Sequence, residues 1–270
     1  ETEITPLYQK IWMDDGSPLR VYSHKITEAL NSMTDDVEFE FAMRYGNPSI
    51  MSGLEKLKAK GVEELLLLPM FPHYAQATTE SSLKHSYKQL AKMDWNPKII
   101  EMGHFETDEE YVIPLTKSIQ PHIDEDTHLL FSYHGLPVSH VKRIDKTKSH
   151  CQKIDNCCAI KKEANELCYG HHCMETTHTV VGLLGLKPDQ WSISYQSRIG
   201  PVKWLEPSTT NKIEELVKRG VKKIAIVAPA FLADGLETLE ELDIGIREHF
   251  PDLGGGELTV VKCLNDNQDW

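Results

Sequence analysis

Short apolar runs of strand length alternate with longer amphipathic stretches along the whole chain. The runs lie at 19–22, 37–43, 64–69, 98–102, 127–132, 191–195, 223–228 and 258–261. The run at 64–69 is almost continuously apolar, which is typical of a parallel strand buried on both faces. Because strands that alternate with helices usually form parallel sheets covered by helices on both faces, the pattern predicts an α/β fold.

The amphipathic stretches predict helices between these strands. They lie at 25–33, 49–60, 81–93, 108–120, 176–186, 208–219 and 236–249. Gly61 and Gly220 are placed to end two of these helices, and Ser208 is placed to cap the start of another. The length suits two such units, and we place the boundary near residue 125, which gives halves of 1–125 and 126–270.

Composition excludes several classes of protein. The 270 residues are 40% hydrophobic and 26% charged, with a formal net charge of −12. This length supports a core without disulfides, and the acidic balance argues against a nucleic-acid partner, which would need a basic face. No apolar run approaches the ~20 residues of a membrane span, and no secretory signal is visible near Glu1. We expect a cytoplasmic protein with at most peripheral contact with the inner membrane.

One segment is dense in cysteine. Five of the six cysteines fall within 23 residues, namely Cys151, Cys157, Cys158, Cys168 and Cys173. Such a cluster indicates a metal site or a local disulfide knot. The reducing cytoplasm favours the metal site.

Four loops follow strands, at 69–82, 132–137, 195–207 and 228–243. In open parallel sheets, ligands bind beyond the carboxyl ends of the strands. The first loop is rich in aromatic and hydroxyl side chains, so it forms either the wall of a pocket for a flat ligand or a capped entry to a helix. The third loop offers Arg198 to pair with a carboxylate and Trp204 to stack on a ring, although Trp204 would equally fill a seam between the halves.

The second and fourth loops carry the most reactive groups. His134 ends a strand before Gly135, and a neutral imidazole there either takes a proton or binds a metal, or is simply hydrogen-bonded at the strand end. Asp234, Glu237 and Glu241 share one face at helical spacing. Acidic side chains are favourable at the N-terminus of a helix, which accounts for Asp234 and Glu237 but not for Glu241, further along the helix. The row suits a hard cation or a proton path.

Taken together and in this order, the loops resemble those of the ferrochelatase family. The matching motifs are the loop at 69–82, FSYHGLP at 131–137, YQSRIGP at 195–201 and DGLETLEELD at 234–243. The resemblance covers nearly the whole chain. It implies two similar Rossmann-like halves, each a parallel four-stranded sheet flanked by helices, with a porphyrin in the cleft between them. The implied activity is insertion of ferrous iron into protoporphyrin IX to form haem b, the terminal step of haem biosynthesis.

The resemblance also implies roles for individual residues. His134 matches the essential metal-site and proton-abstracting histidine, and Glu237 matches its partner across the cleft. Glu241 and Asp243 match acids that continue the row. The residues that match porphyrin contacts are Arg44, Tyr45, Phe71, Tyr74 and Trp204.

The chain departs from the family pattern at both ends and in the acidic row. The family's first strand and its glycine-containing loop are not found before Glu1, so we expect the first half to lack its first strand, and the end after Trp270 looks short. Gly235 stands where some members carry histidine, and Gly245 where many carry an acid. The acidic row is therefore expected to be shorter here.

The cysteine-rich stretch, at about 145–173, lengthens the usual family spacing between His134 and Gln196. It resembles the internal segment of bacterial ferrochelatases that carry a 2Fe–2S cluster, for which four thiolates suffice. The preferred set is Cys151, Cys158, Cys168 and Cys173. Structural zinc, bound by four cysteines or with His150, His171 or His172, is the alternative, followed by free thiols. The distance in chain from the catalytic motifs suggests a structural or sensing role.

Other functions fit the same motifs. One is a ferrochelatase acting on coproporphyrin, and another is a cobalt chelatase of the same fold. A different class is a non-catalytic porphyrin- or haem-binding protein with an iron–sulfur sensor, but retention of both His134 and Glu237 argues against passive binding. The expected partners are porphyrin and ferrous iron, with no nucleic acid, and the sequence identifies no iron donor or haem acceptor.

Overall fold

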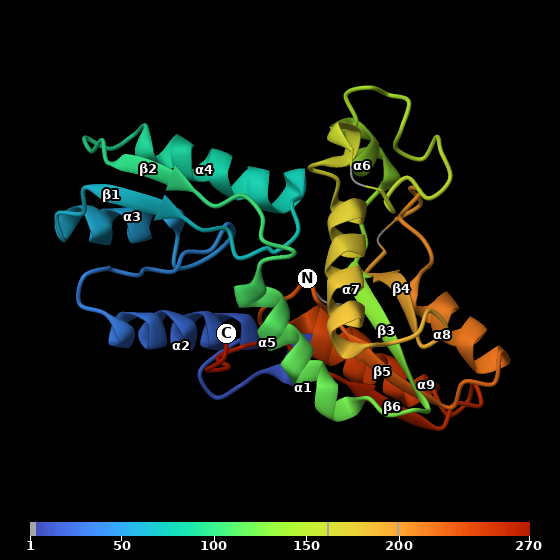
Figure 1. Cartoon of the computed structure of the whole chain (residues 1–270). Helices are drawn as coiled ribbons and strands as arrows, with labels where there is room; N and C mark the ends of the chain where they lie inside the picture. The colour runs from blue at the N-terminus through green and yellow to red at the C-terminus, as the bar shows by residue number, and fades with distance from the viewer. Residues whose placement is uncertain (1–3, 161, 199) are drawn as a thin grey trace.

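The computed structural model describes residues 4–160, 162–198 and 200–270. Its largest sheet has four parallel strands, ordered β4 (Trp191–Gln196), β3 (Thr127–His134), β5 (Lys223–Val227) and β6 (Glu257–Val260) (Figure 1). β3 lies between two partners, and every one of its residues except His134 is buried. The predicted parallel four-stranded sheet is therefore confirmed in the second half.

Helices cover this sheet on both faces. The connections are α6 (Val138–Ile144) and α7 (Tyr169–Leu184) from β3 to β4, α8 (Thr209–Lys218) from β4 to β5, and η4 (Leu236–Ile246) with α9 (Arg247–His249) from β5 to β6. The first connection crosses the sheet in the opposite direction from the other two, which places it on the opposite face. Accordingly Leu129 and Phe131 pack in the cluster that contains α7, whereas Leu130 packs with α8 and η4.

The first half contains a smaller sheet. The parallel strands β1 (Glu64–Leu67) and β2 (Lys98–Glu101) are covered on one face by α3 (Ile50–Ala59) and α4 (Ser81–Leu90), with the π-helix η1 (Gln76–Glu80) leading into α4. On the other face, Leu66 and Ile100 are 53% and 44% exposed. The prediction that the run at 64–69 is buried on both faces is wrong, because helices cover only one face of these strands.

Two further strands predicted in this half are absent from the described residues. The run at 19–22 lies inside α2 (Pro18–Met33), which begins with proline at its first position. A four-residue apolar run does not by itself distinguish a strand from a helix. The segment 37–43 is extended but has no strand ladder, and the Asn31 side chain instead pairs with both the N–H and the carbonyl of Phe39, each at 2.9 Å. This half therefore shows two strands rather than four.

Most predicted helices are found close to their predicted bounds. Ser208 caps α8 by accepting a hydrogen bond from the Asn211 backbone N–H at 3.2 Å. Gly61 follows α3 with a positive φ of 76°, as its role in ending that helix requires. Two short 3-10 helices, η2 (Gln120–His122) and η3 (Glu163–Asn165), complete the elements together with α1 (Thr5–Ile11) and α5 (Glu109–Ile119).

Packing joins the two halves at several points. Tyr111 and Leu115 of α5 belong to the core on the α7 side of the large sheet. On the other face of that sheet, α1 lies against η4, and the Lys10 ammonium pairs with the Glu240 carboxylate at 3.0 Å. The boundary near residue 125 stays a prediction. Within the described residues, no helix is both long enough and apolar enough to cross a membrane.

His73, in the loop after β1, is buried where the first half meets α7. Its Nε2 lies 2.8 Å from the Thr176 hydroxyl, and its ring contacts the rings of Tyr111, Tyr133 and Tyr169 edge-on. Burial lowers the pKa of His73 to about 3, so the folded protein keeps this imidazole neutral. The ordinary histidine pKa of about 6.5 applies in the unfolded chain.

This difference predicts that the protein loses stability as the pH falls below about 6.5. At pH 5 the His73 imidazole is protonated in the unfolded chain but stays neutral in the folded protein. The free energy of unfolding therefore falls by about 2 kcal/mol between pH 7 and pH 5. In His73→Gln that contribution is absent, and the urea midpoint should depend less on pH. The exposed His122→Gln is the control. An equal pH dependence in wild type and His73→Gln would contradict the assignment.

Candidate active site

The candidate groups meet at the carboxyl edge of the large sheet. His134 is the last residue of β3, and its register partner Gln196 is the last residue of β4. The loop after β5 brings Phe231 beside the His134 ring, with 6.1 Å between the ring centroids. Glu237 lies in the first turn of η4, which follows that loop. The predicted grouping of the strand-end motifs at one edge is therefore observed.

The His134 imidazole has a defined proton position. Its Nδ1 lies 2.7 Å from the Gly135 carbonyl oxygen, which can only accept a hydrogen bond. Nδ1 must therefore carry the proton, which leaves the Nε2 lone pair free in the neutral ring. Such a nitrogen can accept a proton or bind a metal ion.

The peptide group between His134 and Gly135 is held at both ends. The Tyr169 hydroxyl donates to the His134 carbonyl at 2.9 Å, and the Gly135 N–H donates to the Gln196 carbonyl at 2.8 Å. A Cβ at Gly135 would lie 2.7 Å from the Gln196 carbonyl oxygen and 3.3 Å from the Trp204 ring. Only glycine fits at this position without moving the backbone.

Gln196 links β3 to η4, the helix that carries Glu237. Its amide oxygen accepts from the Ser132 hydroxyl at 2.7 Å, and its amide nitrogen donates to the Glu237 backbone carbonyl at 2.8 Å. The sequence pattern assigns no site role to Ser132 or Gln196. The available signal is their position: Ser132 stands two residues before His134 in FSYHGLP, and Gln196 stands at a strand end in YQSRIGP.

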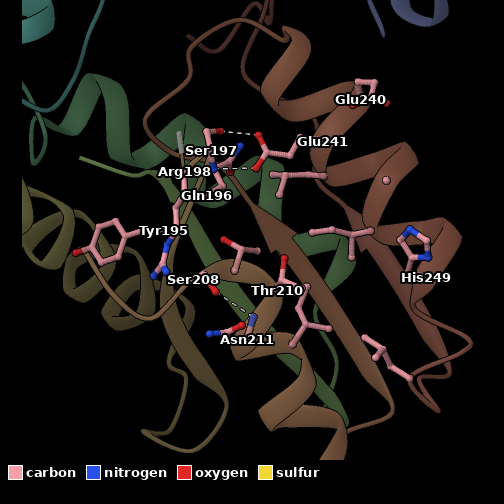
Figure 2. Close-up of a pocket in the computed structure, with 16 residues that line it drawn as sticks. Tyr195, Gln196, Ser197, Arg198, Ser208, Thr210, Asn211, Glu240, Glu241 and His249 are labelled. Carbon is pink, nitrogen blue, oxygen red and sulfur yellow. Dashed lines mark hydrogen bonds between the residues drawn. The ribbon is translucent and has the colours of Figure 1, made fainter. Parts of the chain in front are cut away.

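η4 is an eleven-residue π-helix, where the sequence predicted an ordinary helix over 236–249. π-helical geometry is rare and occurs mostly as single turns, often at functional sites. The Glu241 carboxylate accepts hydrogen bonds from the Ser197 backbone N–H at 2.8 Å and from its hydroxyl at 2.5 Å (Figure 2). Glu241, Gly245 and His249 line a cavity of about 540 Å³ between η4 and α8.

The acidic row divides into groups with different partners. Asp234 is buried and accepts from the Thr238 hydroxyl at 2.9 Å and the Asn265 amide at 2.7 Å, so it serves the fold. Asp243 is paired with the Arg247 guanidinium, whose Nε lies 2.9 Å from its carboxylate. Glu237 and Glu241 are half-buried, and no ion pair with a lysine or arginine is found for either within the described chain.

The residues predicted to contact porphyrin come from both halves. In the first half, the Arg44 guanidinium lies over the Tyr45 ring at 4.5 Å, and Tyr45 is 76% exposed. Phe71 is half-buried. Burial and a 2.9 Å hydrogen bond to Glu80 raise the pKa of Tyr74 to about 12, so its hydroxyl stays protonated. In the second half, Trp204 lies beside Gly135.

Four of the five clustered cysteines approach one another at the start of α7. The Cys157 and Cys158 sulfurs are 3.8 Å apart, and Cys168 is hydrogen-bonded to both Cys151 and Cys158. These thiol donors lower the pKa of Cys168, while the same contacts and burial raise the pKa values of Cys151 and Cys158. The four sulfurs thus form one continuous series of contacts, from Cys151 through Cys168 and Cys158 to Cys157.

Cys173 lies in a different environment. It is completely buried in the core on the α7 side of the sheet, and burial raises its pKa well above the usual value. Its thiol is hydrogen-bonded to Tyr169. Cys151 and Cys168 belong to the same core cluster, but their thiols contact other cysteines, whereas the Cys173 thiol contacts Tyr169.

One other group has the composition of a metal site. Within the described residues, His104, Glu106 and His172 are the one set of three or more potential ligands whose ligand atoms all lie within 4.8 Å of one another. However, His172 Nδ1 accepts the Tyr74 backbone N–H at 3.1 Å, and its Nε2 lies 2.7 Å from the Glu166 carbonyl. Nε2 must therefore carry the proton, so His172 has no lone pair free for a metal. The trio serves as a hydrogen-bonded link between the halves.

Comparisons with known proteins agree on one family. A family model described as "Ferrochelatase" matches residues 1–270. The chain is 38% identical over 265 residues to the ferrochelatase of Ectopseudomonas mendocina (strain ymp) and 39% identical to that of Stutzerimonas stutzeri (strain A1501). The ferrochelatase of Bdellovibrio bacteriovorus is 37% identical over 266 residues. Each alignment covers 97% of this chain and 78% of the relative.

Two solved structures resemble the fold. "SirB from Bacillus subtilis with Fe3+" has a TM-score of 0.60 at 13% identity and covers 94% of this chain and 87% of its own. The sirohydrochlorin chelatase SirB from Bacillus subtilis subspecies spizizenii in complex with cobalt has a TM-score of 0.59 at 10% identity, covering 93% and 83%. At these identities the likeness shows the fold alone, and it confirms the α/β arrangement of parallel sheets and helices.

The close approach at Gly135 gives a testable prediction. In Gly135→Ala, the new methyl group would push the peptide after His134 away from Gln196, so we expect a large loss of turnover. Gly182→Ala is the matched control, because a Cβ at Gly182 meets no atom within 4 Å. It should keep full activity and gain about 0.5–1 kcal/mol of stability as a helical alanine. Wild-type turnover in Gly135→Ala would contradict the role of this peptide.

Proposed function

The chain belongs to the ferrochelatase family and inserts ferrous iron into a porphyrin in the synthesis of haem, and we propose that His134 and Glu237 carry out this reaction. Insertion replaces two pyrrole N–H protons by one Fe²⁺, so two protons leave for every iron that enters. A base near the ring centre is therefore needed.

The observation that carries the assignment of the base is the hydrogen bond from His134 Nδ1 to the Gly135 carbonyl. It keeps the Nε2 lone pair unprotonated in the neutral ring, ready to accept a pyrrole proton or to contact the iron. A histidine whose two nitrogens were both occupied by protein groups, as in His172, would serve neither purpose.

Glu237 is proposed as the acidic partner of this base. Its backbone is fixed by Gln196 at the same edge of the sheet, and its charge contributes to raising the pKa of the nearby Tyr8 phenol, after burial. A carboxylate offers Fe²⁺ negative charge and an oxygen ligand. Glu241, four residues on along η4, is proposed to extend the acidic path toward the cavity. For Asp243 the pairing with Arg247 argues against a large contribution.

The proposed porphyrin is protoporphyrin IX, held against Phe71, Tyr74 and Trp204, with Arg44 and Tyr45 at its rim. Aromatic side chains suit the flat macrocycle, and the Arg44 guanidinium suits a propionate. The resemblance of His134-Gly135-Leu136-Pro137 to the protoporphyrin-using type supports this choice. Parallel assays with protoporphyrin, coproporphyrin, iron and cobalt distinguish it from the related activities.

His134→Ala tests the base directly. We expect the metallation rate to fall by about 10²–10⁴-fold or below detection, because no other base is proposed at the ring centre. Porphyrin binding, measured by fluorescence quenching, should persist. The exposed His122→Ala is the control. Turnover like that of the wild type in His134→Ala would sink the assignment.

We further propose that the cysteine-rich segment holds a 2Fe–2S cluster on Cys151, Cys157, Cys158 and Cys168. The mutual contacts of these four sulfurs support this set, whereas the Cys173 thiol is hydrogen-bonded to Tyr169 and not to another cysteine. Four cysteine thiolates are the ligand set that a 2Fe–2S cluster requires, and these four side chains lie in one short segment. When bound, such a cluster supplies a one-electron redox centre.

Structural zinc fits these residues less well. Sulfurs on one tetrahedral zinc lie roughly 3.8 Å apart, given Zn–S bonds of about 2.3 Å. Among the described residues, no three cysteine sulfurs all lie within 4.8 Å of one another. A 2Fe–2S cluster divides its thiolates between two irons and does not need that closeness. His150 and His171 instead bond the carbonyls of Cys157 and Cys158, at 2.7 and 2.8 Å, and so support the segment.

Single substitutions test the ligand set. Cys168→Ala should abolish the visible charge-transfer bands of anaerobically purified protein, whereas Cys173→Ala should retain them with some loss of stability. Cys263→Ala, outside the segment, is the control. A colourless wild-type protein with stoichiometric zinc would reject the cluster, and loss of the bands in Cys173→Ala would restore Cys173 to the ligand set.

A further inference from the structure

Tyr169 is the first residue of α7 and directly follows Cys168. Its side chain is buried, and its hydroxyl lies 2.9 Å from the His134 carbonyl oxygen. A phenol has one hydrogen and a carbonyl only accepts, so Tyr169 is the donor. The bond therefore joins the first turn of α7 to the backbone of the last residue of β3.

The bonded carbonyl belongs to the peptide that orients the His134 ring. The N–H of that peptide is held by the Gln196 carbonyl, and the next carbonyl, that of Gly135, receives the proton on His134 Nδ1. A shift of this peptide would move the acceptor that fixes the proton on Nδ1. The direction of the Nε2 lone pair thus depends on both hydrogen bonds to the peptide.

The other end of the link is the cysteine segment. Cys168 contacts Cys151 and Cys158, and the Cys158 sulfur packs so closely on the first turn of α7 that a Cβ at Gly170 would lie 3.1 Å from it. The position of Tyr169 is therefore set by the same turn that carries the cysteine contacts. The cysteine segment is distant from His134 in sequence. In space, the two are connected by Tyr169, which follows Cys168 and is hydrogen-bonded to the His134 carbonyl.

We propose that Tyr169 is a positioning residue for metal insertion, and that it transmits the packing of the cysteine segment to the backbone of His134. This inference rests on the proposed role of His134 as the base. It gives the cysteine segment a specific effect on the reaction, because disorder in the first turn of α7 would release one of the two hydrogen bonds that hold the peptide.

Tyr169→Phe in the cluster-containing full chain tests the proposal. The substitution removes the hydroxyl and keeps the ring that packs against His73. We expect kcat to fall about 3- to 10-fold, as for the loss of one hydrogen bond that aligns a reacting group. KM and the dissociation constant for porphyrin, and the visible cluster spectrum, should stay unchanged.

Tyr111→Phe is the matched control. Tyr111 is also buried in the same core cluster and also donates to a backbone carbonyl, that of Pro229 at 2.6 Å. Tyr111→Phe removes the same type of hydrogen bond, but one that is not made to His134, so kcat should be retained. The thermal midpoint should fall in both variants. Comparing the two variants separates positioning from a general loosening of the core.

Three outcomes would overturn the proposal. These are unchanged kcat in Tyr169→Phe, an equal fall in Tyr111→Phe, and loss of the cluster bands in Tyr169→Phe, which would make Tyr169 a residue of cluster assembly only. None of them affects the assignment of His134, which is tested separately by His134→Ala. Conversely, turnover in His134→Ala would remove the premise whatever Tyr169→Phe shows.

Discussion

The candidate site depends on the position of one peptide group, the one between His134 and Gly135. The carbonyl of that peptide is bonded by Tyr169 and its N–H by Gln196, and the following carbonyl fixes the proton on the His134 ring. Glycine is required there because a side chain would collide with the backbone of the neighbouring strand. The proton position on the imidazole is thus set by the backbone at the end of β3.

α7 connects this peptide to the rest of the molecule. Near its start lie the clustered cysteines, and along its length Thr176 bonds His73 and His172 bonds the backbone of Tyr74, both in the first half. The cysteine-rich segment, at about 145–173, therefore lies next to the candidate site in the folded protein. This helix therefore contacts both halves and the His134 backbone through hydrogen bonds that are buried or partly buried.

The periodicity of the sequence predicted the second half closely and the first half less well. β3 was recognisable because a central parallel strand is apolar on both faces, and α8 because its cap and its glycine stop are local signals. The run at 19–22 predicts a strand, although it lies in α2, because four residues are too few to show a helical period. The segment 37–43 has the alternation of a strand, but its backbone finds a side-chain partner, Asn31, instead of a ladder.

The motifs predict a candidate site, but they leave its chemistry incomplete. They single out His134, Glu237 and the clustered cysteines, because these residues carry rare chemical groups at fixed places in the chain. Only the tertiary structure decided which nitrogen of His134 is free, which acids are already paired, and that the Cys173 thiol contacts Tyr169 while the other four cysteines contact one another. The physical reason is that these properties depend on hydrogen bonds between residues far apart in sequence, such as Ser132 to Gln196 and Gln196 to Glu237. Periodicity reports what a residue's neighbours in the chain are, whereas proton positions and charge depend on the groups that folding brings into contact.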